Sequence, residues 1–167
     1  MRTKCTVEKV SVSPFFTSEK RPYEFIAAAS IFVRITRTYK DGKKENADLQ
    51  ITLSPMYKTD GASTFWPISL IVPPWRPGDD RYNAAPVAHD VLYLLGGIVE
   101  GEREPVKLSR EEVDDILRGM WRCWGMSRFI AGCADKGVEL FAGGNKHWNN
   151  DSYGVRQYVK AKWIMND

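Results

Sequence analysis

The stretch IFVRITRTYKDGKKENADLQITL, residues 31–53, decides the fold class of this chain. Large apolar residues recur at every second position in both of its halves: Ile31, Val33, Ile35, Leu49, Ile51 and Leu53. A period of two is the pattern of a strand with one buried face. Asp41-Gly42 lies between the halves and favours a tight turn, since glycine readily takes positive φ. The stretch therefore predicts a β-hairpin.

The segments on either side of the hairpin extend this interpretation. Residues 4–12 alternate more weakly and predict an edge strand, so residues 1–54 are expected to be mainly strands. Residues 55–82 contain five of the chain's nine prolines, which break regular elements, and are also rich in large apolar residues. Because a solvent-exposed linker would not be so apolar, we predict a long loop packed onto the core.

Residues 83–96, NAAPVAHDVLYLLG, predict the first helix. Asn83 is a suitable N-cap, and Pro86 is tolerated in a first turn. Gly96-Gly97 would end the helix.

A polar loop is expected next, over residues 98–108. Ser109 and Glu112 then form a capping box, and the helix that follows has apolar residues at 3–4 spacing until Gly125 ends it. A third helix is predicted over about 126–142. The chain is thus predicted to be one α+β domain, with an N-terminal antiparallel sheet packed against a three-helix half over 83–148. No assignment follows for residues 149–167.

Composition limits the function classes. The net charge is +3, and basic residues alternate with acidic ones, so we expect no specific nucleic-acid partner. The three cysteines, Cys5, Cys123 and Cys133, lack C-x-x-C spacing, which argues against a disulfide framework or a zinc site.

The motif A-H-D-V-L-Y, residues 88–93, places polar groups in an otherwise apolar helix. His89 and Tyr93 are four residues apart and share a helix face, while Asp90 points about a quarter-turn away. Buried polar groups cost free energy unless they are paired. Either the fold pairs these side chains for structural reasons, or a functional site uses them.

Asp114 lies one turn into the capped second helix. If the two helices pack antiparallel, Asp114 faces His89 and accepts its N–H, which leaves the other ring nitrogen free as a general base. Asp90 is then available as a hard oxygen ligand for a cation such as calcium. Asp115 points elsewhere on the helix.

Other kinds of site have weaker support. Ser63 lies in D-G-A-S-T, which is not a nucleophile elbow. His89, Asp90 and His147 could bind a transition metal, but no second spaced pair of ligands supports that site. Cys123 and Cys133 fit small core residues better than nucleophiles.

Over residues 59–148 the chain resembles a family of phage and prophage proteins, catalogued as domain of unknown function thirteen fifty-three. The resemblance rests on four motifs: T-D-G-A-S (59–63), H-D-x-L-Y (89–93), S-R-x-x-x-D (109–114) and V-E-L-F-A-G with a following tryptophan (138–148). It implies a phage origin and assigns no activity.

H-D-x-x-Y with an aspartate on the next helix is also similar to the catalytic helices of phospholipase A2, especially the compact disulfide-free form in parvovirus capsids. This resemblance implies that His89 activates water and that Asp114 orients His89, with Tyr93 supporting Asp114. It also implies that Asp90 binds calcium, which would polarise an ester carbonyl and stabilise its oxyanion.

The loop that would complete such a calcium site is less similar. Residues 57–61 read Y-K-T-D-G, whereas the phospholipase loop has a Y-x-G-x-G character. Gly61 could lend backbone groups to calcium. Alternatively, T-D-G-A-S is a turn that hydrogen-bonds to the helix carrying His89.

The leading hypothesis is therefore a phage-encoded protein with a hydrolase-like His/Asp site, acting on lipid esters with calcium. The alternative is a non-enzymatic virion or tail-associated protein whose same residues form a buried hydrogen-bond network, and a third is a small protein that binds a host factor. The expected partners are a lipid or membrane interface or other virion proteins. The N-terminus lacks a signal-peptide pattern and no apolar run could span a bilayer, so we expect the host cytoplasm or the virion.

Overall fold

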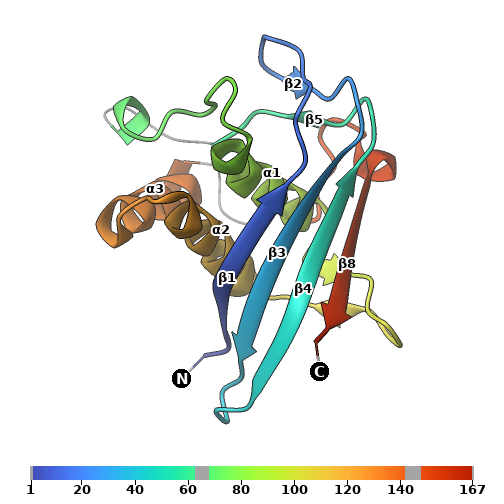
Figure 1. The fold of residues 1–167 in the computed structure, drawn as a ribbon, viewed down its shortest axis with the longest axis vertical. Coiled ribbons are helices and arrows are strands. Elements are labelled where there is room, and N and C mark those ends of the chain that lie inside the picture. The colour runs from blue at the N-terminus through green and yellow to red at the C-terminus, as the bar shows by residue number, and fades with distance from the viewer. Residues whose placement is uncertain (1, 63–67, 142–147, 167) are drawn as a thin grey trace.

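The computed structural model describes residues 2–62, 68–141 and 148–166. Its centre is an antiparallel sheet in the order β1-β3-β4-β8: β1 (Lys4–Val12), β3 (Ala29–Thr38), β4 (Lys44–Leu53) and β8 (Val159–Met165). Three helices lie on one side of this sheet (Figure 1): α1 (Asp80–Leu94), α2 (Arg110–Trp124) and α3 (Arg128–Phe141). The other elements of the described residues are short: β2 (Tyr23–Glu24), β5 (Lys58–Thr59), η1 (Ile68–Leu70), β6 (Ile98–Val99), β7 (Val106–Lys107) and η3 (Arg156–Tyr158). The predicted α+β class is confirmed.

The predicted hairpin is present as β3 and β4, which pair from Ala29↔Leu53 to Thr38↔Lys44. Gly42 takes the positive φ of 86° that the turn needs. The six alternating apolar side chains are all 0% exposed, which confirms the period-two reading: Ile31, Val33, Ile35, Leu49, Ile51 and Leu53. The helices pack on this buried face of the sheet.

Both edges of the sheet come from the ends of the chain. The predicted edge strand β1 pairs with β3, with a bulge between Val7 and Lys9. The other edge is β8, which pairs with β4 and buries Val159, Ala161 and Trp163. Strand β8 was not predicted. Because it pairs with β4, the segment that precedes it returns to α1.

Helix α1 begins earlier than predicted. Its N-cap is Asp79, whose side chain accepts from the backbone N–H of Tyr82, so the assignment of Asn83 as the cap is wrong. Asn83 is buried inside the helix, where its amide bonds the backbone N–H and C=O of Arg76. Pro86 consequently lies inside the helix instead of in its first turn. Gly96 and Gly97 follow the helix with φ of 61° and 72°, as expected of its end.

Helix α2 has the predicted boundaries. The side chain of Ser109 accepts from the Glu112 N–H and that of Glu112 accepts from the Ser109 N–H, so the capping box is present. Gly125 ends the helix with φ 116°. The segment expected to be a polar loop, 98–108, contains the short β6–β7 pair instead, because Val99 packs into the core.

Helices α1 and α2 are antiparallel, as the predicted contact between His89 and Asp114 requires. Near the start of α1, Asp79 accepts from the indole N–H of Trp124 at the end of α2. Towards the end of α1, His89 reaches Asp114 near the start of α2. The antiparallel pairing thus places the H-D-x-x-Y motif beside the first turns of α2.

The loop over 55–82 packs onto the core only in part. Val72 is fully buried, and Trp75 stacks on Tyr23 with ring centroids 4.4 Å apart. Leu70 and Ile71, however, are exposed, which the prediction of a packed loop did not anticipate. Phe65 and Trp66 lie outside the described residues. None of the helices in the described part of the chain is both long and apolar enough to cross a membrane.

Candidate functional site

Helix α1 is buried on nearly every side, from Tyr82 through Leu94. A helix in that position must find a partner for each polar side chain it carries, since an unpaired buried polar group is costly. Asn83 is satisfied by the backbone of Arg76. His89 and Asp90 find their partners on two different sides, and these two sets of contacts form the candidate site.

On one side, His89 and Tyr93 converge on Asp114. His89 Nε2 lies 2.9 Å from Asp114 Oδ1, and the Tyr93 hydroxyl donates to the same oxygen at 3.0 Å. The rings of His89 and Tyr93 pack with centroids 4.2 Å apart. The i, i+4 spacing on α1 and the capped start of α2 therefore bring together the three predicted residues.

The surroundings keep Asp114 ionised. Burial acts to raise the pKa of Asp114, but the hydrogen bonds from His89 and Tyr93 and the charge of Arg118 outweigh it and leave the pKa below its usual value. An ionised carboxylate against Nε2 requires that this nitrogen carry the proton. The other nitrogen, Nδ1, is then the basic one.

Asp115 is excluded from the site, as predicted. Its carboxylate accepts from Arg2 at 2.7 Å and also from Arg118, and it bonds the backbone N–H of Cys5. These contacts tie α2 to the start of the chain and direct Asp115 away from His89.

On the other side of α1, Asp90 bonds the loop that contains the T-D-G motif. The Thr59 hydroxyl donates to Asp90 Oδ2 at 2.7 Å and accepts from the backbone N–H of Gly61 at 3.1 Å. The motif is thus a turn that is hydrogen-bonded to the helix carrying His89, one of the two readings its sequence allowed. Burial raises the pKa of Asp90 to about 6, against the lowering effects of His89 and Thr59.

Gly61 is required at its position by backbone geometry. Its φ is +73°, and a Cβ there would come within 2.2 Å of the carbonyl oxygen of Pro74. The next residue, Ala62, donates its N–H to that carbonyl at 2.8 Å. The close approach of the two loop segments fixes Thr59 against Asp90. Ser63, the last residue of the motif, lies outside the described residues.

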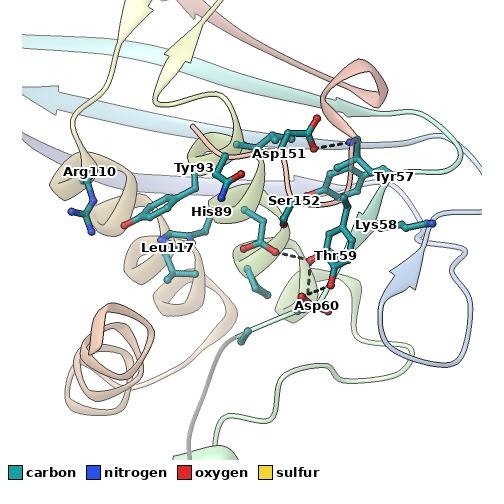
Figure 2. Close-up of a pocket in the computed structure, with 18 of the residues that line it drawn as sticks. Tyr57, Lys58, Thr59, Asp60, His89, Tyr93, Arg110, Leu117, Asp151 and Ser152 are labelled. Atoms are coloured by element: carbon teal, nitrogen blue, oxygen red, sulfur yellow. Dashed lines mark hydrogen bonds between the residues drawn. The ribbon is translucent and has the colours of Figure 1, made fainter. Parts of the chain in front are cut away.

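A cavity of about 150 Å³ lies against both sets of contacts. Its walls come from the loop after β4, from α1 and α2, and from the segment before η3. Figure 2 shows His89 and Tyr93 on one side of the cavity and Tyr57, Thr59 and Asp60 on the other, with Asp151 and Ser152 between them in this view. The predicted residues His89, Asp90, Tyr93 and Gly61 all line it, whereas Asp114 lies behind His89.

The wall formed by residues 148–155 is held to the end of α1. The Asn149 N–H donates to the Tyr93 carbonyl at 2.7 Å, and Arg156 donates to the Leu94 carbonyl at 2.8 Å. Across the cavity, the Tyr153 hydroxyl donates to Asp60 at 2.7 Å. Sequence reasoning missed Asp60 and Tyr153, because the two residues are 93 positions apart and neither lies in a periodic segment.

The cysteines lie away from this cavity. Cys123 contacts the carbonyl of Val7, and burial raises the pKa of its thiol. None of the described residues that line the cavity is a cysteine, and Cys123 and Cys133 are half-buried instead of fully in the core. His147 lies outside the described residues.

Comparison with protein families shows which family the chain matches. The model of a family described as protein of unknown function (DUF1353) matches residues 33–134, well over half of the chain. The matched region contains β4, α1, α2 and part of β3, together with His89, Tyr93 and Asp114. No curated protein and no solved structure matches the chain.

Proposed function

The chain belongs to this family of unknown function, and we propose that it is a hydrolase in which His89 acts as a general base on water and Asp114 holds His89 in place. The observation that carries the proposal is the contact of His89 Nε2 with Asp114 Oδ1 at 2.9 Å, on a histidine that lines a cavity. A base held by a carboxylate and open to a cavity is the arrangement that hydrolytic water activation needs.

In the proposed reaction, Nδ1 of His89 accepts a proton from a water molecule in the cavity as the water oxygen attacks an acyl carbon. The imidazolium that forms is stabilised by the ionised carboxylate of Asp114. Tyr93 supports that carboxylate through its hydroxyl. The proton then passes from Nδ1 to the leaving oxygen, and His89 returns to its neutral form.

The proposed substrates are lipid esters, and the support is the surface beside the cavity. Phe16, Ile26 and Met56 are 59%, 68% and 54% exposed. Their loops are adjacent, because the Ile26 N–H donates to the Phe16 carbonyl and the Met56 N–H to the Phe25 carbonyl. Met56 directly precedes Tyr57, which lines the cavity. A group of exposed apolar side chains on adjacent loops suits contact with a lipid interface.

Calcium binding at Asp90 stays a prediction, and the donor set fits calcium poorly. Calcium takes six to eight oxygen ligands. One oxygen of Asp90 already accepts from Thr59, and the Gly61 N–H is bonded to the same hydroxyl. No group of three His, Cys, Asp or Glu side chains in the described ranges could hold a metal ion. The proposed reaction therefore uses only side chains of this chain.

A second candidate function is structural, as a virion or tail component. The observation that favours it is that His89 is 6% exposed and that its bond to Asp114 joins two core helices. In that case the same contacts serve only to hold α1 against α2.

The test is hydrolysis of mixed-phospholipid vesicles and short acyl esters, with calcium and with a chelator. His89→Gln is compared with wild type, because glutamine keeps a polar group of similar size but provides no base. We expect wild type to release fatty acid and folded His89→Gln to lose at least about 100-fold in rate. No turnover by folded wild-type protein on any of these esters, or equal turnover by the variant, would contradict the proposal.

A further inference from the structure

Three carboxylates from three separate segments face the cavity. Asp60 follows β5, Asp90 lies on α1, and Asp151 precedes η3. Their fields converge on the Tyr57 hydroxyl: burial raises the pKa of Tyr57 well above its usual value, and the charges of all three carboxylates raise it further. The interior of the cavity is therefore a region of negative potential.

The basic residues around the cavity offset this negative charge only in part. Lys58 and Arg110 both line the cavity, but Figure 2 shows the Lys58 amine pointing away from it. Arg110 lies beyond Tyr93, with its guanidinium 5.9 Å from the centre of that ring. Arg21 pairs with Asp60 at 3.4 Å from an exposed position, 52% accessible.

Tyr57 is the second and independent sign of a ligand. The residue is only 1% exposed and lines the cavity. Its hydroxyl makes no hydrogen bond to another residue in the described part of the chain, so it is available to a molecule bound in the cavity. A ligand in the cavity would supply its hydrogen-bond partner.

The hydrogen bonds of the carboxylates favour an organic cation over a metal ion. Asp151 uses both oxygens to accept from the backbone N–H groups of Val155 and Arg156. Asp60 accepts from Tyr153, and Asp90 accepts from Thr59. Carboxylates oriented in this way attract positive charge without forming a ligand cage. Aromatic walls such as the ring of Tyr57 suit an ammonium group, through cation–π contact.

We infer that the cavity binds an ammonium group between Asp60, Asp90 and Tyr57, and that the substrate carries this group near the bond that is cut. The assignment of the substrate class rests on the proposed hydrolysis. Binding of the ammonium group does not rest on it, because neither His89 nor Asp114 is needed to attract the cation.

The test is calorimetric titration of the full chain with n-butylammonium and with n-butanol, which has the same length and no charge. We expect n-butylammonium to bind at least about tenfold more tightly than the alcohol. Asp90→Asn and Asp60→Asn should each weaken its binding by about tenfold. Glu102→Gln, an equal charge change on the exposed β6–β7 loop, should leave binding unchanged. Tyr57→Phe should weaken binding several-fold without loss of thermal stability, since its hydroxyl bonds no described residue.

Three outcomes would overturn the inference: equal binding of ammonium and alcohol, no binding by folded protein, or binding of calcium alone. His89→Gln separates the inference from the proposed function. If that variant and wild type bind n-butylammonium equally while neither hydrolyses an ester, the cavity binds ammonium and the hydrolase proposal fails. If esters are cut but ammonium does not bind, the hydrolase proposal stands and this inference fails.

Discussion

The imidazole of His89 and the hydroxyl of Tyr93 bind the same oxygen of Asp114, Oδ1, at 2.9 and 3.0 Å. The two side chains come from one face of α1, so both hydrogen bonds link α1 to α2 through the same oxygen. Removing one of the two bonds should leave the other in place.

Tyr93→Phe should therefore lower the free energy of unfolding only modestly, by about 1 kcal/mol. The proposed hydrolysis should fall several-fold and not vanish, because Asp114 keeps its bond to His89. Urea unfolding followed by circular dichroism, together with the ester assay, measures both quantities. Complete loss of the fold would show that Tyr93 has a larger structural role than one hydrogen bond.

Asp114→Asn should destabilise the protein at neutral pH by about 1–3 kcal/mol, because the amide cannot stabilise a charged or strongly donating imidazole as a carboxylate does. The folded pKa of Asp114 is lowered, so its ionised form contributes stability above the unfolded pKa of about 3.9, and this contribution is lost as the pH falls through the folded pKa. Urea unfolding at pH 7 and at pH 3 checks the sign. A wild-type advantage that is equal at the two pH values would contradict it.

Asp90→Asn should have the opposite effect on stability. Burial raises the folded pKa of Asp90 to about 6, so the charged group opposes folding once the pH exceeds the unfolded pKa. Asparagine keeps an oxygen for the Thr59 hydroxyl and carries no charge. We expect the variant to match wild type below about pH 4 and to exceed it by about 2–3 kcal/mol at pH 8. Denaturant titrations at pH 4 and 8 test this, and a variant less stable than wild type at pH 8 would refute it.

Gly61→Ala should be strongly destabilising, by about 2 kcal/mol or more, because a Cβ would come within 2.2 Å of the Pro74 carbonyl oxygen at a φ of +73°. Gly42→Ala is the matched control. Gly42 has a φ of +86°, but nothing lies within 4 Å of the added Cβ. The difference between the melting temperatures of the two variants measures the cost of the contact alone. Equal losses would mean that backbone strain is the whole effect.

Local patterns allowed much of the fold and part of the site to be predicted. The hairpin follows from alternation and a turn glycine, and α2 follows from a capping box formed by residues three apart. The contact of His89 with Asp114 was predictable from two short-range signals: the helical spacing of the motif on α1 and the capped start of α2. The antiparallel pairing of these helices brings the two residues together.

The failures have physical causes. The start of α1 was misplaced because Asn83 is a good capping residue, yet Asp79 takes the cap and Asn83 is buried against Arg76. Strand β8 was missed although V-K-A-K-W alternates, since Tyr158 and the residues before it belong to a 3₁₀ turn and obscure the period. Other contacts, such as Tyr153 with Asp60, depend on tertiary approach and leave no local signal.

The pairing of β8 with β4 has a consequence for how the protein matures. A chain emerges from the ribosome N-terminus first. The contacts of His89, Tyr93 and Asp114 involve only residues that are synthesised before residues 148–155, the last wall of the cavity. Docking of the final strand fixes that wall against α1. The hydrogen-bonded triad is thus encoded ahead of the segment that closes the last side of the cavity.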